Sequence, residues 1–257
     1  MAERQLLFSQ QDADLTVRVW QQDDRRWLDF DDTVIQSEII LDQPEKLPLA
    51  LNRHMLAGCL FVDQPRTILL AGTGGGATAR YFSHRFPNVS GDAVELSPLI
   101  CDVARDFFEF PQDEQWHIHA QDINHYVADS QQLYDLIIID IAEEQLTPDW
   151  IVDSDFLQHC RSLLTQQGHI AFNLLVNDGS ALMHFLSAIR AVFNGMTVCM
   201  SVPEHRNIVV FAYNSEPEFD EQAITEKLQD LEPKWGLEFN DFYQQMLKDN
   251  PKGSGVL

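Results

Sequence analysis

The fold is decided by one stretch, TILLAGTGGG at residues 67–76, in which an apolar run passes directly into glycines. The first five residues predict a buried strand, and residues 77–86 after the glycines have the apolar spacing of a helix. Glycines at such a junction let the backbone turn sharply and approach a ligand closely. A tight turn without a ligand would also use glycines, but the strand before them and the helix after them favour a ligand site. The expected cradle consists of Gly72, Gly74, Gly75 and Gly76.

Strands and helices alternate from this stretch to about residue 213. Further strands are expected at 92–95, 117–120, 134–140, 169–175, 196–201 and 207–213. Helices are expected from residue 98, over 155–164 with Gly168 closing it, and over 180–193. The run 134–140 is apolar at nearly every position, as in a central parallel strand covered on both faces. The sequence therefore predicts an α/β fold with a doubly wound, mostly parallel seven-stranded sheet.

A smaller segment flanks this region on each side. Residues 15–20, 26–30 and 34–41 predict a small β-meander, and residues 49–61 predict a helix. This unit is too thin to be stable alone, so it should pack on the larger α/β region. Residues after 216 predict an acidic tail with helices at 222–231 and 238–247. We expect three domains, at 1–62, 63–215 and 216–257.

The composition narrows the choice of partners. The chain has 257 residues, with 17 Lys and Arg against 40 Asp and Glu, so its formal net charge is −23. Proteins that bind nucleic acids or anionic membrane surfaces use clustered basic residues, so the excess of acidic residues disfavours both as partners. The four cysteines are widely spread without a C-x-x-C pair, which argues against a disulfide framework and a thiolate metal site. With neither a leader nor a membrane-length apolar run in the sequence, we expect a cytoplasmic protein.

Two acids come after expected strands near the glycine stretch. Glu95 ends the second strand, where dinucleotide folds hold a ribose diol, and its carboxylate can accept hydrogen bonds from both hydroxyls. Asp122 comes after the third strand. It is equally suited to accepting a hydrogen bond from an adenine amino group and to capping the next helix.

A third acid and the loop after it suggest an amine site. Asp140 ends the fourth strand, at the edge where open α/β sheets bind ligands. Glu143 and Glu144 come soon after, so the loop either holds an amine or is a solvated acidic loop. His117 and His119 share one face of the third strand, which could suggest a metal. Because that strand looks internal, we interpret them as structural and expect no metal site.

The pattern resembles the S-adenosylmethionine-dependent methyltransferase fold, in the branch of the spermidine/spermine synthases. The resemblance covers about residues 25–213. It rests on the β-meander, the run DTVIQSE at 32–38, and the glycine motif with Arg80 downstream. It implies a transferase that uses S-adenosylmethionine or its decarboxylated form as co-substrate, without a metal, and often as a homodimer. Gln36 matches the family's ligand-contacting glutamine.

The resemblance also assigns roles to the acids. Glu95 would bind the ribose hydroxyls and Asp122 the adenine, while Asp140 would hold and deprotonate the attacking amine. The amine half departs from the family pattern. The family's GGGDGG reads GTGGGA at 72–77, so Gly75 replaces the acid that contacts the aminopropyl ammonium. The family's D-S-S-D-P reads DIAEE at 140–144, so its second acid is at best Glu143, and its Tyr-His-Glu-Met-Leu run reads NRHML at 52–56.

Three functions are compatible with these residues. The leading hypothesis is an aminopropyltransferase of the spermidine synthase type, with Asp140 and Glu143 as catalytic residues and a small polyamine as a weak or different acceptor. The alternative is a methyltransferase of unknown acceptor, which the loss of the acid at Gly75 favours, because S-adenosylmethionine carries a carboxylate and an amine there. A nucleoside-binding protein without turnover is the third.

Overall fold

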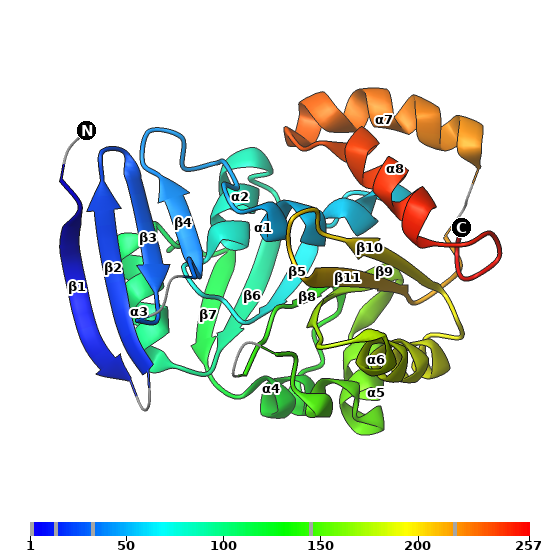
Figure 1. Ribbon diagram of the computed structural model, residues 1–257, viewed down its shortest axis with the longest axis horizontal. Coiled ribbons are helices and arrows are strands. Elements are labelled where there is room, and N and C mark those ends of the chain that lie inside the picture. Colours follow the sequence, from blue (N-terminus) through cyan, green and yellow to red (C-terminus); the bar gives the residue numbers. More distant parts are fainter. Residues whose placement is uncertain (1–2, 13–14, 32–33, 144–145, 218–219) are drawn as a thin grey trace. The chain divides into compact units, whose positions relative to one another are not determined.

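The computed structural model describes residues 3–12, 15–31, 34–143, 146–217 and 220–257 (Figure 1). A seven-stranded sheet has the order β10-β11-β9-β8-β5-β6-β7, and a separate four-stranded sheet has the order β1-β2-β3-β4. Strand β6 runs parallel to β7 and β8 parallel to β9, whereas β11 is antiparallel to β9 and β10. The predicted α/β class, with a mostly parallel seven-stranded sheet, an N-terminal meander and C-terminal helices, is confirmed.

The elements have the following bounds. The small sheet contains β1 (Gln5–Asp12), β2 (Leu15–Gln22), β3 (Arg25–Asp29) and β4 (Ser37–Ile40). The large sheet contains β5 (Thr67–Ala71), β6 (Ser90–Glu95), β7 (Trp116–Ala120), β8 (Tyr134–Ile139), β9 (Leu164–Leu175), β10 (Thr197–Ser201) and β11 (Asn207–Tyr213). The helices are α1 (Ala50–Met55), α2 (Ala77–Arg85), α3 (Pro98–Phe107), α4 (Ile123–Asp129), α5 (Ser154–Ser162), α6 (Gly179–Val192), α7 (Glu221–Trp235) and α8 (Phe239–Asp249). Two short 3₁₀ helices are η1 (Ala57–Phe61) and η2 (Asp149–Val152).

The chain forms two compact units, residues 1–52 with 70–123, and residues 53–69 with 124–257. In the first unit, one face of the small sheet packs on α3 (Figure 1). Alternate residues of a strand point to the same face, so Val17 and Val19 of β2 are buried together there. Leu28 of β3 and Ile39 of β4 join them. The small sheet therefore packs on a helix of the α/β region, as the sequence predicts.

Arg80 of α2 ties several segments of the first unit together. It is fully buried, and its guanidinium donates to the carbonyl oxygens of Pro44 (2.9 Å), Phe108 (2.6 Å), Glu38 (3.2 Å) and Gly75 (3.4 Å). Burial lowers the pKa of Arg80 to about 10, which still leaves it charged at neutral pH. Four carbonyl dipoles therefore hold a buried cation, and they fix the glycine loop to β4 and to the end of α3.

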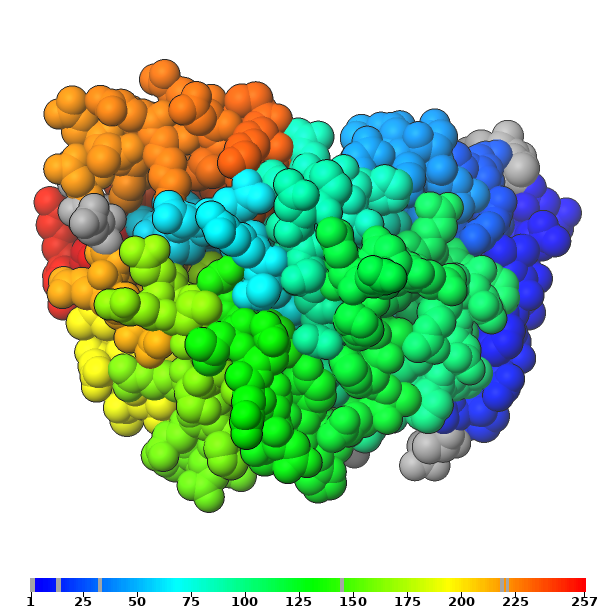
Figure 2. Space-filling model, turned by 180° about the vertical axis from the view of Figure 1, so that it is seen from behind, coloured from blue at the N-terminus to red at the C-terminus, as the bar shows by residue number. Residues whose placement is uncertain are grey.

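In the second unit, residues 249–256, here called the C-terminal segment, lie along the free edge of β10. The Asn250 side chain accepts from Cys199 N (2.9 Å) and donates to Cys199 O (2.7 Å), as a neighbouring strand would. The carboxylate of Asp249 accepts from Ser201 N (2.6 Å), and Val256 N donates to Thr197 O (3.2 Å). Figure 2 shows these red C-terminal residues lying against the yellow and orange segments. An edge that could pair with another chain is thereby occupied.

Several elements differ from the sequence-based prediction. Strand β1 was not predicted, because its sequence QLLFSQQD lacks regular alternation. The expected helix 49–61 is α1 followed by η1, where Gly58 packs so closely on Phe211 that a Cβ would lie 2.5 Å from its ring. Gly168 lies inside β9 rather than closing a helix, at a register irregularity opposite β8.

The interpretation of the strand 117–120 as internal is wrong. Strand β7 is the last strand of the sheet order. His117 is exposed, and His119 bonds the Asp92 carboxylate through Nε2 at 2.7 Å. An exposed edge strand offers room for polar side chains on both faces, so these histidines do not need a buried structural role.

Candidate nucleoside and amine sites

The loop between β5 and α2 depends on glycine conformations. Gly72, Gly74 and Gly76 have φ values of +83°, +50° and +70°. Residues with a Cβ rarely adopt this region, whereas glycine adopts it readily. The turn is closed by a hydrogen bond from Gly76 N to Thr73 O of 2.8 Å. The predicted sharp turn between strand and helix is therefore present.

The glycines of this loop differ in what surrounds them. A Cβ at Gly75 would lie 2.5 Å from Ser37 Oγ and 2.9 Å from Phe108 Cγ, and one at Gly76 would lie 2.5 Å from the Phe110 ring. At Gly74 the nearest such atoms are 3.9 Å away. Gly75 and Gly76 are therefore needed for packing within the protein. Gly74 is the position where the loop leaves space beside its backbone.

Glu95, at the end of β6, sits on this loop. Its Oε2 accepts hydrogen bonds from Thr73 N (3.0 Å) and Gly74 N (3.4 Å), and its Oε1 accepts one from Ser97 N (3.1 Å). A carboxylate has about four lone-pair positions, so about one remains. A ribose diol offers two O–H donors. Holding both would need the longest of the three bonds, from Gly74 N, to be released.

Gln36 and Asp122 belong to the same unit as the glycine loop and Glu95. Gln36 is exposed just before β4, its backbone N–H donates to Leu28 O (2.9 Å), and its own carbonyl oxygen lies 3.9 Å from the Cβ position of Gly74. Asp122 is partly exposed between β7 and α4. Their predicted roles stay predictions. Residues 32 and 33 of the quoted run lie outside the described residues.

Asp140 comes directly after β8 in the second unit. It is partly exposed, and its Oδ1 accepts a hydrogen bond from Asn173 Nδ2 at 2.8 Å. Burial raises the pKa of this carboxyl, and the Asn173 hydrogen bond opposes that rise. Asn173 in turn accepts from Asn207 Nδ2 at 2.9 Å. Sequence reasoning missed both asparagines, because nothing in the pattern of β9 or β11 marks a polar residue as facing Asp140.

Glu143 has a partner of its own. The side chain is exposed, and its Oε1 accepts a hydrogen bond from the Trp150 indole at 3.0 Å. Its backbone pairs with Leu146 in both directions, at 2.8 and 2.9 Å. Glu144 lies outside the described residues, and the proposed use of Glu143 as a second amine-binding acid stays a prediction.

Metal-binding clusters and membrane-length helices are both absent from the described part of the chain. Within those ranges, no group of three or more His, Cys, Asp or Glu side chains is placed to hold a metal ion. Nor is any helix there long and apolar enough to span a membrane.

Known proteins match this architecture over most of its length. The family model of the spermine/spermidine synthase domain matches residues 52–216. The chain belongs to the spermine/spermidine synthase family. A polyamine aminopropyltransferase of Chromobacterium violaceum is 28% identical over 243 residues, which are 94% of this chain and 93% of that protein. This family member is therefore a transferase.

Two solved structures have the same fold. Spermidine synthase from Thermotoga maritima matches with a TM-score of 0.69 at 16% identity, over 94% of this chain and 84% of that one. Human methyltransferase-like protein 13, solved in complex with SAH, matches with a TM-score of 0.68 at 25% identity, over 74% of this chain and 94% of that one. The fold is therefore shared by a spermidine synthase and a methyltransferase.

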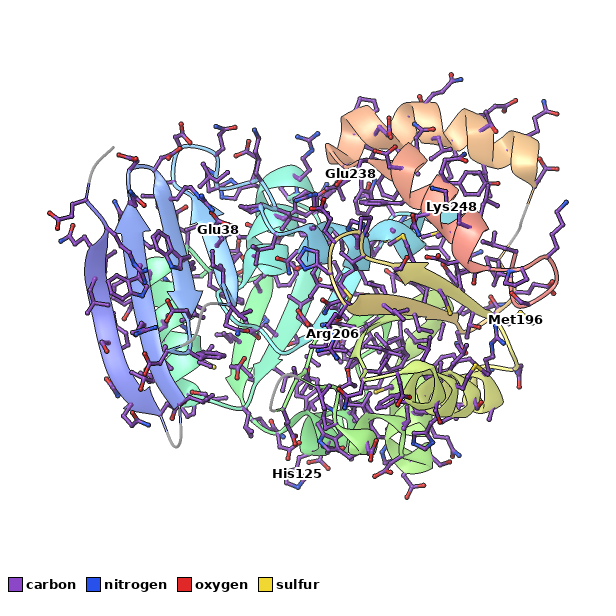
Figure 3. The ribbon with its side chains drawn as sticks, viewed as in Figure 1. Glu38, His125, Met196, Arg206, Glu238 and Lys248 are labelled. Carbon is purple, nitrogen blue, oxygen red and sulfur yellow. The ribbon has the colours of Figure 1, made fainter. Side chains whose placement is uncertain are left out.

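The structure gives physical reasons for two departures from the family pattern. At Gly75, where the resemblance places an acid, a side chain would require Ser37 or Phe108 to shift, because its Cβ would lie 2.5 Å from Ser37 Oγ and 2.9 Å from Phe108 Cγ. In the run at 52–56, the Arg53 side chain donates to Glu238 Oε1 at 2.7 Å. The His54 side chain is buried, and its ring centroid lies 4.8 Å from that of Phe242. Glu238 lies at the start of α8 (Figure 3). The Arg53 and His54 side chains therefore both contact residues of α8 or its N-cap.

Proposed function

We propose that this family member transfers an aminopropyl group from decarboxylated S-adenosylmethionine to a small amine. The observation that carries the proposal is the Glu95 carboxylate on the backbone amides of the glycine loop, where about one lone-pair position remains for a ribose hydroxyl. The Chromobacterium relative, a polyamine aminopropyltransferase similar along nearly the whole chain, supports the reaction type. Gln36 and Asp122 are proposed to contact the same nucleoside.

The chemistry is a displacement. The neutral amine nitrogen attacks the carbon beside the sulfonium, the C–S bond breaks, and its electron pair returns to sulfur as a thioether. The attacking nitrogen then carries an extra proton, which Asp140 is proposed to accept. The raised pKa of Asp140 suits a general base, because a more basic carboxylate takes a proton more readily. Glu143 is proposed to attract the distal ammonium of the amine.

A specific observation favours methyl transfer as a second candidate. Position 75 carries no acid that could bind an aminopropyl ammonium, and a side chain there would require Ser37 or Phe108 to shift. S-adenosylmethionine carries an additional carboxylate, and the human methyltransferase relative was solved with SAH. The two candidates use the same nucleoside loop, but they differ in which co-substrate binds tightly.

Calorimetry distinguishes these candidates. Titrating the protein with S-adenosylmethionine, its decarboxylated form and methylthioadenosine gives three dissociation constants under one set of conditions. Tighter binding of the decarboxylated form supports aminopropyl transfer. Tighter binding of S-adenosylmethionine supports methyl transfer and contradicts our first choice. If none of the three binds to folded protein, both proposals are wrong.

A further inference from the structure

We propose that Asn207 and Asn173 form a relay of two side-chain amides that fixes the orientation of the Asp140 carboxylate and leaves its Oδ2 for the substrate. The inference rests on the proposed function for the role of Asp140 as a base. Asn173 and Asn207 are positioning residues in this scheme, because they act through Asp140.

Strand register brings the three residues together. Strands β8 and β9 run parallel, and Asp140 and Asn173 each lie one residue beyond the register pair Ile139–Phe172. On the other side, β11 runs antiparallel to β9, with Asn207 opposite Leu175 and therefore diagonal to Asn173. The hydrogen bonds are 2.8 Å from Asn173 Nδ2 to Asp140 Oδ1 and 2.9 Å from Asn207 Nδ2 to Asn173 Oδ1.

The direction of these bonds matters for the chemistry. An amide has one accepting and one donating end, so an Asn207 donor at Asn173 Oδ1 turns the Asn173 NH₂ group toward Asp140. A donor stabilises the ionised carboxylate, which is the form that can accept a proton. If the Asn173 amide were reversed, its oxygen would face the Asp140 carboxylate. Repulsion between the oxygens would then disfavour ionisation of Asp140. Asn207 thereby sets the state of Asp140 without touching it.

Burial supports a relay rather than a pair of surface contacts. Asn173 is only 5% exposed, so its amide cannot be oriented by bulk water. Its backbone is also held, since Thr147 Oγ1 donates to Asn173 O at 3.3 Å and accepts from Leu175 N at 2.8 Å. A buried amide with one partner at each end costs free energy to turn over.

Charged groups on the adjoining segments have partners elsewhere. Glu143, on the loop after β8, accepts from the Trp150 indole. Arg206, which precedes β11 (Figure 3), donates to Val176 O (3.3 Å) and Asn177 Oδ1 (3.4 Å). The two influences that stand out on the Asp140 pKa in the described structure are therefore burial and the Asn173 amide.

The test is a carbon-13 NMR titration of the aspartate carboxyl signals, in which Asp140→Asn identifies the Asp140 resonance. Asn207→Leu keeps the size of the side chain and removes its donor. Asn214→Leu is the matched control, because Asn214 is also partly exposed and lies in the same unit. Its Nδ2 donates to Thr165 O (3.0 Å) and its Oδ1 accepts from Arg161 Nε (3.1 Å), so it does not bond the three residues of the relay. Asn173→Leu removes the direct donor. It is the riskier variant for folding because the residue is buried.

The relay predicts that Asn173→Leu raises the Asp140 pKa by about one unit or more, since a hydrogen bond to a charged group is lost. Asn207→Leu should raise it by less but measurably, and Asn214→Leu should leave it unchanged. An Asp140 pKa in folded Asn207→Leu equal to that of the wild type would overturn the proposal. The titration needs no turnover, so it gives a result even if aminopropyl transfer proves wrong. If transfer occurs, the acid limb of kcat/KM should shift upward in the same order of variants.

Discussion

The Glu95 carboxylate accepts hydrogen bonds from the glycine loop and is proposed to hold the ribose as well. Glu95→Gln keeps the size but loses one acceptor oxygen and the charge. We expect nucleoside affinity to fall at least about 100-fold, since hydrogen bonds to charged groups contribute roughly 1.5–3 kcal/mol each. A modest loss of thermal stability should accompany it. Calorimetry and thermal melts check both, with the exposed Glu114→Gln as control. Full affinity in the folded variant would remove Glu95 from the site.

The close packing around Gly75 could not be predicted from the sequence. Its predicted place in the ligand cradle stays a prediction, and the structure adds that its Cβ position lies 2.5 Å from Ser37 Oγ and 2.9 Å from Phe108 Cγ. Gly75→Ala should therefore destabilise the protein by about 1–3 kcal/mol through overpacking. Gly179→Ala is the control, because nothing lies within 4 Å of that Cβ position. Urea unfolding measures both. Equal stability of the two variants would show that the loop yields easily and that an acid could be accommodated there.

At the scale of elements, the C-terminal segment acts as a substitute for a neighbouring strand of β10. Asn250→Ala removes the two hydrogen bonds to Cys199 and one to Met246 O. Loss of a buried, fully bonded amide should cost about 1–3 kcal/mol and should expose the edge to pairing with other chains. Sedimentation velocity at rising concentration should reveal larger species. Asn240→Ala, on the exposed side of α8, should behave as wild type. A monodisperse Asn250→Ala protein would contradict this role of the C-terminal segment.

The elements themselves were largely predictable, and the failures have local causes. Apolar runs such as Ile137–Ile139 identify buried strands because few other structures use them. Strand β1 escaped prediction because its side chains are exposed or half-buried and lack regular alternation, and it is held by pairing with β2. Gly168 could be placed only from tertiary structure. A Cβ there would lie 2.9 Å from Tyr134 O, a contact with β8 that the sequence does not reveal.

At the scale of the whole molecule, one buried histidine should govern acid stability. His169 is fully buried, neither ring nitrogen has a hydrogen-bond partner in the described structure, and burial lowers its pKa from 6.5 to about 3. The unfolded chain therefore binds a proton between these values that the folded chain does not. The contribution of neutral His169 to the free energy of unfolding is complete above pH 6.5. It is lost as the pH falls toward 3, at roughly 1.4 kcal/mol per pH unit.

His169→Phe should flatten that dependence while keeping an aromatic ring beside Tyr213, whose ring centroid lies 5.4 Å away. Urea unfolding of both proteins at pH 7, 6 and 5 is the measurement. We expect the wild type to lose stability faster than the variant over this range. Parallel loss would mean that other groups control acid unfolding.

The site was predictable only in part, because a sequence places residues along strands but does not say what they touch. The positions of Glu95 and Asp140 at strand ends could be predicted, and their roles stay predictions. The three loop bonds of Glu95 and the packing of Gly75 could not, since they depend on which side chains cross to the loop. The Asn173–Asn207 chain depends on register between β9 and β11, which lie far apart in sequence.

Aminopropyl transfer with Asp140 as base is tested most directly by the transfer itself. Purified wild type and Asp140→Asn are incubated with decarboxylated S-adenosylmethionine and putrescine, spermidine or cadaverine, and the alkylated amine is quantified by mass spectrometry. We predict transfer to at least one amine, weak transfer to putrescine because position 75 carries no acid, and loss of transfer in Asp140→Asn. No product from any amine with the wild type, or equal rates for the two proteins, would contradict the proposed function.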